Sequence, residues 1–257
     1  DTNSKMIILP SDHLIKFNEI FIDTLKTALD VVEKDDNLAT IGITPNYPET
    51  GYGYINFKKG ERFKNISNVY EVLSFVEKPN LEKAKEYLAS GQYLWNSGMF
   101  VWKTSTILKN FKKYLPKIYD GLQKIGESIN TPKYEDTLKD VFSNLPSESI
   151  DYGIMEKADN IYVIPGNFGW DDVGSWLSLE RINKTNQDGN VINGNVISIK
   201  TKNTIIQGGN KLIATIGLKD IVIVDTDDVT LICHKNNTQE VKEVISNLRI
   251  CNRNEYL

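Results

Sequence analysis

Apolar residues in the first part of the chain form short continuous runs separated by a stretch with helical spacing. Residues 6–9 (MIIL) are fully apolar and end at Pro10, which predicts a buried parallel strand. Residues 38–44 predict a second strand. Between the two runs, the apolar residues with near-helical spacing are Ile15, Ile20, Phe21, Leu25, Ala28, Leu29 and Val32. A strand, a helix and a strand in this order predict a right-handed crossover, a parallel sheet and an α/β fold.

The alternation of strands and helices continues to about residue 184. The further apolar runs that predict strands are residues 69–76, 93–102 and 161–165. Asn80 is placed to cap a helix that follows the first of these runs. Residues 104–157 have helical spacing with breaks near their prolines, and residues 150–157 predict a short helix.

The character of the sequence changes after about Lys184. Short β-rich runs, separated by Asn-Gly, Gly-Gly and Asp-Asp pairs, predict a small separate β domain. The runs are residues 191–192, 196–199, 204–206, 212–216, 221–224 and 229–232. Residues 238–248 then predict an amphipathic helix, whose apolar stripe we expect to pack on this chain or on a partner subunit; the stripe is Val241, Val244, Ile245 and Leu248. We therefore expect one domain over residues 1–184 and a second over residues 185–257.

The composition narrows the class of partner. The 257 residues carry a net charge of −4 and no basic stripe, so we expect no nucleic-acid partner. No apolar run approaches the roughly 18 residues of a membrane span, so we expect no membrane insertion. Cys233 and Cys251 lack the spacing of a metal site or a disulfide framework, which favours a cytoplasmic protein.

Residues 169–176 (GWDDVGSW) place two acids between a predicted strand and a predicted helix. Asp171 and Asp172 are therefore expected at the sheet edge where α/β proteins bind ligands, and Gly174 lets the backbone turn there. Acids at the start of a helix often cap it, and on this segment alone capping is the favoured interpretation. Asp12, which follows the first strand, supplies another acid and makes a ligand-binding role more attractive.

Three other segments combine small and polar residues near strand ends. Tyr52 is flanked by glycines, an arrangement equally suited to a ligand-facing bend and to a plain hairpin turn. Pro79 is expected to keep Lys78 extended, so that Glu77 and Lys78 project from a strand end, although such turns are usually solvated corners. Asn96-Ser97-Gly98 interrupts an apolar run and needs hydrogen-bond partners, which either a polar ligand or the backbone around a β-bulge would supply.

Taken together, six segments resemble the family of bacterial mannose-1-phosphate guanylyltransferases. Each is weakly specific alone, but all occur in the family's order and cover nearly the whole chain. The segments are residues 9–13, 49–55, 75–79, 95–100, 149–156 and 170–176. The resemblance implies a nucleotide-diphospho-sugar transferase domain with a Rossmann-like mixed sheet, followed by a small β-helix-like domain.

The resemblance also implies a reaction, in which GMP is transferred from GTP to mannose 1-phosphate to give GDP-mannose and diphosphate. Two anions must approach each other, so a divalent cation and basic groups have to offset their repulsion. By resemblance, Asp12 and Asp172 are the carboxylates that hold Mg²⁺, Asp171 is left to capping, and Lys78 holds the sugar phosphate. The substrate-binding residues that the resemblance implies are Tyr52, Gly53, Glu77, Asn96 and Gly98.

Members of this family open with a strand and a Gly-rich loop that cradles the nucleotide phosphates. We expect that segment to precede Asp1, and we expect residues 1–257 alone to be inactive. Two other hypotheses stay open: a non-catalytic sugar-phosphate-binding or regulatory subunit, and a nucleotidyltransferase that uses another base. The β domain is expected to form a homodimer.

Overall fold

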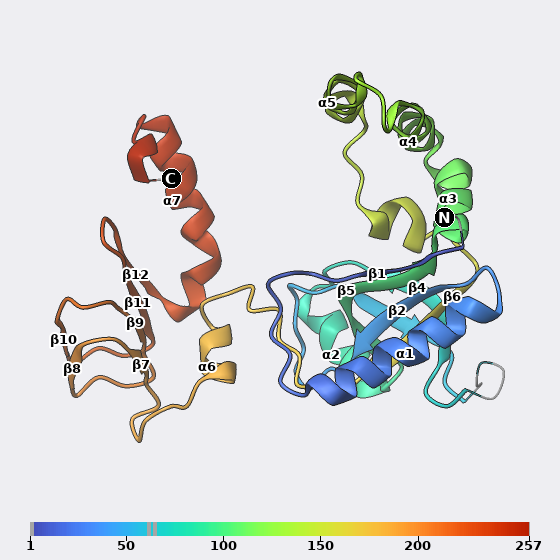
Figure 1. Cartoon of the computed structure of the whole chain (residues 1–257). Coiled ribbons are helices and arrows are strands. Elements are labelled where there is room, and N and C mark those ends of the chain that lie inside the picture. The colour runs from blue at the N-terminus through green and yellow to red at the C-terminus, as the bar shows by residue number, and fades with distance from the viewer. Residues whose placement is uncertain (1–2, 61–62, 64–65, 257) are drawn as a thin grey trace. The chain divides into compact units, whose positions relative to one another are not determined.

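The computed structural model describes residues 3–60, 63 and 66–256. The chain divides into two compact units (Figure 1), each with its own hydrophobic core. The first unit comprises Asp1–Ser11 and Ile15–Trp170, and the second comprises Asp12–Leu14 and Asp171–Leu257. This division follows packing alone, and the domain boundary expected at residue 184 stays a prediction.

A six-stranded mixed sheet, in the order β1-β5-β2-β6-β4-β3, forms the centre of the first unit. Its strands are β1 (Lys5–Ile8), β2 (Leu38–Ile43), β3 (Tyr54–Phe57), β4 (Tyr70–Val76), β5 (Tyr93–Lys103) and β6 (Ile161–Gly166). Strands β2 and β6 pair in parallel, whereas β5 is antiparallel to β1, β2 and β3. All six residues of β2 are buried, as expected for a central strand.

The prediction of a buried parallel first strand is wrong in two respects. β1 pairs antiparallel with β5 and lies at the end of the strand order, and its side chains are exposed, with Met6 and Ile7 at 38%. A local run of apolar residues predicts extended backbone, but it does not contain the order of strands in the sheet. Because β1 and β2 flank β5 and are both antiparallel to it, they do run in the same direction.

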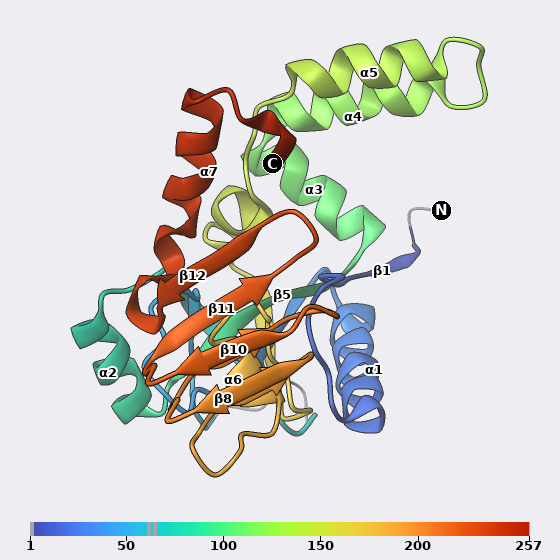
Figure 2. The same cartoon turned by 90° about the vertical axis from the view of Figure 1, so that its left-hand side faces the viewer.

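Helix α1 (Asn18–Lys34) confirms the first predicted helix and packs its apolar side chains against the sheet. Helix α2 (Leu81–Ser90) is capped as predicted, since the Asn80 side chain accepts a hydrogen bond from Lys83 N. The predicted helical region contains α3 (Thr104–Tyr114), α4 (Pro116–Ser128), α5 (Tyr134–Asn144) and the π-helical turn η1 (Asp151–Met155). Figure 2 shows α4 and α5 lying side by side as a hairpin.

The second unit consists mainly of short strands in two sheets, ordered β12-β11-β9-β7 and β10-β8. Its elements are α6 (Ser178–Ile182), β7 (Val191–Asn193), β8 (Val196–Ile199), β9 (Ile205–Gln207), β10 (Ile213–Ile216), β11 (Ile221–Asp225), β12 (Thr230–His234), the 3-10 turns η2 (Lys235–Glu240) and η3 (Asn254–Tyr256), and α7 (Val241–Ile250). Each predicted run of the β domain coincides with one of these strands. Strands β7, β9 and β11 pair in parallel, as do β8 and β10, which gives the coiled arrangement expected of a β-helix-like domain.

Helix α7 confirms most of the predicted amphipathic helix, but it buries none of its residues. Val244 and Ile245 are 48% and 40% exposed, whereas Val241 and Leu248 are partly buried, so the described part of the chain covers the apolar stripe only in part. No helix among those residues is long and apolar enough to cross a membrane.

Candidate functional site

Five of the predicted site residues, Gly53, Glu77, Lys78, Asn96 and Gly98, lie together in the first unit, and we call them the strand-end cluster. Asn96 N donates to the Gly53 carbonyl oxygen over 2.8 Å. Gly53 lies so close to Glu77 that an added Cβ would be 2.6 Å from Glu77 Oε2. Lys78 Nζ is 3.2 Å from Glu77 Oε1, and Gly98 N donates to Asn96 Oδ1 over 3.0 Å. Residues of β5, residues just after β4 and a residue just before β3 are therefore brought into direct contact.

The amide of Asn96 is held in one orientation. Its Nδ2 donates to Asp151 Oδ1 over 2.7 Å, while its Oδ1 accepts the bond from Gly98 N. An amide has two donor hydrogens and two acceptor lone pairs, so one of each is left for further bonding. Asp151 is not among the site residues that the resemblance implies, although it lies in one of the six segments that carry the resemblance.

The strand pairing is irregular at the Asn96-Ser97-Gly98 segment, and the backbone satisfies its middle residue. The register between β2 and β5 shifts between Thr40 and Gly42, opposite this segment. Ser97 is buried, and its hydroxyl donates to the Ile41 carbonyl oxygen over 2.6 Å. The neighbouring backbone thus satisfies Ser97, so this residue needs no ligand.

Lys78 does not have the extended backbone that was predicted. Its φ is +41°, in the left-handed region. The proline that follows disfavours the right-handed helical region, and a left-handed value also avoids that region while turning the chain from β4 toward the Asn80 cap. The Lys78 side chain is 65% exposed, so its ammonium group is accessible to solvent.

Tyr52 lies beside this cluster within a group of aromatic rings. Its ring makes edge contacts with Trp95 and Trp170, at centroid distances of 5.3 and 5.5 Å. Aromatic pairs in this arrangement are stabilising, so the contacts fix the position of the Tyr52 ring.

The second unit holds the two predicted metal ligands, Asp12 and Asp172. Leu14 N donates to the Asp171 carbonyl oxygen over 2.8 Å, and Asp171 N donates to the Leu14 carbonyl oxygen over 3.1 Å. This pair of bonds aligns the segment from Asp12 to Leu14 with the two acids. Burial lowers the pKa of the His13 imidazole, and the charges of Asp12, Asp172 and Asp171 oppose that shift. The three carboxylates therefore all act on one imidazole.

The capping role that the sequence favoured for Asp171 is wrong, because Asp171 does not cap the helix that follows it. Helix α6 begins seven residues later, at Ser178, and its N-cap position is Leu177. The Asp171 carboxylate instead binds Arg181, with Nε–Oδ2 and Nη2–Oδ1 distances of 2.6 and 3.0 Å, and it accepts a bond from Val173 N. The apolar pattern placed the helix too early, because Trp176, Leu177 and Leu179 pack on the core of the β domain.

The donor set near Asp172 fits Mg²⁺. This cation prefers oxygen ligands and usually takes one or two carboxylates from a protein, completing its shell with phosphate oxygens and water. Asp12 and Asp172 supply that number, since Asp171 is engaged by Arg181. Within residues 3–60, 63 and 66–256, no group of three or more His, Cys, Asp or Glu residues is arranged to hold a metal ion.

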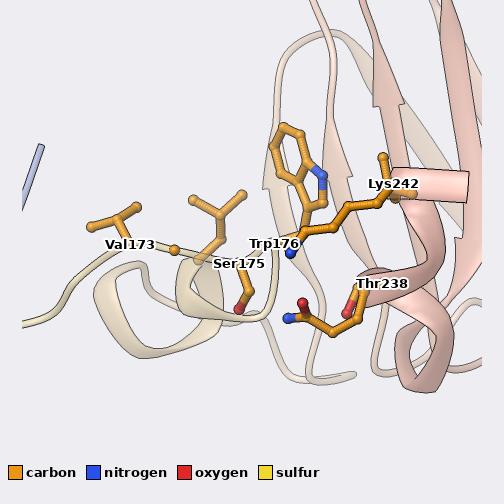
Figure 3. Close-up of a pocket in the computed structure, with 9 residues that line it drawn as sticks. Val173, Ser175, Trp176, Thr238 and Lys242 are labelled. Carbon is orange, nitrogen blue, oxygen red and sulfur yellow. The ribbon is translucent and has the colours of Figure 1, made fainter. Parts of the chain in front are cut away.

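A pocket of about 320 Å³ borders the same turn, between Val173–Trp176 and the region where η2 passes into α7. Figure 3 shows Val173, Ser175 and Trp176 on one side, and Thr238 and Lys242 on the other. None of the predicted site residues lines this pocket.

Two family models match the chain. One, described as nucleotidyl transferase, covers residues 1–189, and the other, described as a mannoseP isomerase/GMP-like beta-helix domain, covers residues 194–248. The fold is therefore a nucleotidyl transferase domain followed by a β-helix domain, as the resemblance implied.

Similar proteins carry related names. A mannose-1-phosphate guanylyltransferase of Escherichia coli K12 is 38% identical over 257 residues, which are 100% of this chain and 54% of the relative. The xanthan biosynthesis protein XanB of Xanthomonas campestris (strain B100) is 42% identical over 97% of this chain and 52% of its own length. A crystal structure from Thermus thermophilus, described as a mannose-1-phosphate geranyltransferase, superposes with a TM-score of 0.84 at 32% identity, over 95% of this chain and 70% of that one. The chain spans about half the length of the curated relatives it matches.

Proposed function

Because the chain belongs to the nucleotidyl transferase family, we propose that its protein transfers GMP from GTP to mannose 1-phosphate, giving GDP-mannose and diphosphate. The observation that supports the reaction type is the antiparallel Leu14–Asp171 bridge, which brings the short segment that carries Asp12 next to the turn that carries Asp172. The choice of substrates is supported by the guanylyltransferase relative that matches the whole chain.

The reaction is an in-line displacement that needs no protein nucleophile. An oxygen of the sugar phosphate attacks the α-phosphorus of GTP, the bond to the β-phosphate breaks, and diphosphate leaves. When bound by Asp12 and Asp172, Mg²⁺ would supply positive charge to the reacting phosphates. Lys78, with its exposed ammonium group, would offset the charge of the sugar phosphate.

The rest of the strand-end cluster would bind the sugar. Glu77 can accept bonds from hydroxyl groups, and Asn96 keeps one donor and one acceptor beyond its bonds to Asp151 and Gly98. Gly53 and Gly98 have no side chain to separate the backbone from a ligand, and Gly98 uses a φ of +68°. Tyr52 offers a fixed ring edge next to them.

The test is diphosphate release from mannose 1-phosphate and GTP in the presence of Mg²⁺, with UTP and dTTP as alternative donors. We expect release with GTP, and we expect calorimetric binding of mannose 1-phosphate to the same protein. Binding of mannose 1-phosphate without turnover of any nucleotide would favour a sugar-phosphate-binding subunit. Turnover only with UTP or dTTP would reject guanine as the base.

We also propose that the protein is cytoplasmic, since GTP is its nucleotide and the structure shows both cysteines as free thiols.

A homodimer through the β domain is supported by apolar side chains exposed on β8 and β10, where Ile199 and Ile216 are 50% and 70% exposed and lie opposite each other. Light scattering on the chain, and on a form ending at residue 184, tests this. A monomer in both cases would reject the dimer.

A further inference from the structure

Arg181 ties together the turn that carries Asp172. Its guanidinium forms a two-pronged ion pair with Asp171, and Nη2 also donates to Ser178 Oγ over 3.0 Å. Ser178 Oγ in turn accepts from Ser175 N over 3.3 Å. Asp171 is buried, with only 8% of its surface exposed, whereas the Arg181 side chain is 31% exposed, so the carboxylate is the shielded partner of the pair. This two-pronged ion pair, which we call the Arg181 fork, thus joins Asp171, the residue before Asp172, to the helix that follows the turn.

The backbone of this turn is strained, so its conformation needs the stabilising ion pair between Arg181 and Asp171. Val173 has a φ of +50°, a conformation that is a genuine outlier for a β-branched residue. Its N–H is bonded to Asp171 Oδ1 over 2.9 Å, so the carboxylate held by Arg181 also holds the strained residue. Such conformations persist only where the surrounding structure over-determines them, and they are common where a site must be preorganised.

The side chain of Asp172 is folded back over this strained turn. A Cβ added to Gly174 would lie 2.5 Å from Asp172 Oδ2, so the carboxylate occupies the space that the glycine leaves. Arg181 Nη2 is 3.8 Å from Asp172 Oδ1, too far for a hydrogen bond but near enough for attraction. Arg181 therefore acts on Asp172 in two ways, through the backbone turn and through this longer ion pair.

We propose that Arg181 is a positioning residue that, through its fork on Asp171, sets the Asp172 carboxylate for binding a divalent cation. The proposal rests on the proposed function, because that function assigns Asp172 to the metal. Asp171 is needed as well, because its carboxylate connects Arg181 of α6 to the backbone of the turn. Arg181 neutralises the charge of that carboxylate. Residues that orient a metal ligand from outside the coordination shell typically contribute 10- to 100-fold to metal affinity.

The experiment measures binding of Mn²⁺ alone, as a paramagnetic substitute for Mg²⁺, to the full chain by electron paramagnetic resonance. Arg181→Lys keeps the positive charge but cannot form the planar fork, and we expect its dissociation constant for Mn²⁺ to rise about 10- to 100-fold. Arg249→Lys makes the same chemical change on the exposed end of α7 and should leave the constant within about twofold. Asp172→Asn is the reference for loss of a ligand.

Arg181→Lys could fail to fold because lysine would pair the buried Asp171 carboxylate less well than arginine does. A second variant covers that case. Asp171→Asn/Arg181→Gln leaves no charge buried at this position, and it should fold while losing Mn²⁺ affinity to a similar degree. Circular dichroism and the unfolding temperature report folding for every variant.

The outcomes separate the two proposals. If Asp172→Asn weakens Mn²⁺ binding and the Arg181 variants do not, the positioning role is wrong and the metal assignment survives. If the unaltered chain does not bind Mn²⁺, or Asp172→Asn binds it normally, the metal assignment fails and the role of Arg181 falls with it. Loss in Asp172→Asn and in both Arg181 variants, with Arg249→Lys unchanged, supports the positioning role.

Discussion

The strand-end cluster and the turn around Asp172 are built in opposite ways. In the cluster, Asn96 is held by Gly53 and by Asp151, partners that are 43 and 55 residues away in the sequence. In the turn, Asp171 is held by Val173 and Arg181, only two and ten residues away, and a single bridge to Leu14 supplies the long-range part. The cluster therefore depends on sheet register, whereas the turn depends mainly on its own local chemistry.

This difference predicts how stability and ligand binding should change when residues of each region are substituted. A change in the cluster disturbs contacts between strands, so it should alter stability and sugar binding together. A change in the turn should alter metal-dependent chemistry with little effect on the rest of the fold. The following predictions test that contrast, from the largest expected effect to the smallest.

Asp172→Asn should have the largest effect on activity. Removing a charged ligand from the reacting phosphates is expected to lower turnover on the order of a thousandfold, with little change in stability. Diphosphate release by the whole protein and its unfolding temperature are the measurements, and Asp188→Asn, at an exposed position, is the matched control. Near-normal synthesis of GDP-mannose by Asp172→Asn would remove this residue from the metal site.

Asn96→Asp should break the cluster and lower stability as well. The new carboxylate would face Asp151 Oδ1 where Asn96 now donates over 2.7 Å, and we expect a loss of about 2 kcal/mol in the free energy of unfolding. Urea denaturation measures the loss. The double variant Asn96→Asp/Asp151→Asn restores a donor and an acceptor and should recover much of it; a double variant as unstable as the single one would show that this hydrogen bond is not the cause.

Gly53→Ala should weaken sugar binding and lower stability together, with the smaller effect on stability. The new Cβ would be 2.6 Å from Glu77 Oε2, so the flexible end of Glu77 must move, and we expect about a tenfold weaker affinity for mannose 1-phosphate, which corresponds to about 1.4 kcal/mol. Calorimetry measures the affinity. Gly209→Ala, where a Cβ meets no atom within 4 Å, is the control and should bind normally. Equal affinities for the two variants would mean that Glu77 does not contact the sugar.

Gly126→Ala should change neither region. Gly126 lies in α4, where a Cβ meets no neighbouring atom, so alanine should raise the free energy of unfolding by about 0.5–1 kcal/mol through a less flexible unfolded chain. Thermal unfolding checks the gain, and diphosphate release should stay unchanged. A drop in activity would show that the α4–α5 hairpin is coupled to the site.

Sequence patterns alone predicted most of the secondary structure. The runs between residues 191 and 232 all became strands, and Asn80 caps α2, because alternation of side chains and capping are properties of neighbouring residues. The resemblance added the set of site residues, five of which the structure brings into contact as the strand-end cluster.

Tertiary structure alone decided which partners those residues meet. An apolar run at residues 6–9 could not show that β1 would lie at the end of the strand order, since strand order depends on hydrogen bonds to distant residues. Two adjacent acids could not show that Asp171 would bind Arg181 instead of capping a helix, because the start of α6 depends on packing in the β domain. Local sequence determines backbone preference within a few residues, whereas register and packing determine which side chains come within hydrogen-bonding distance across the fold.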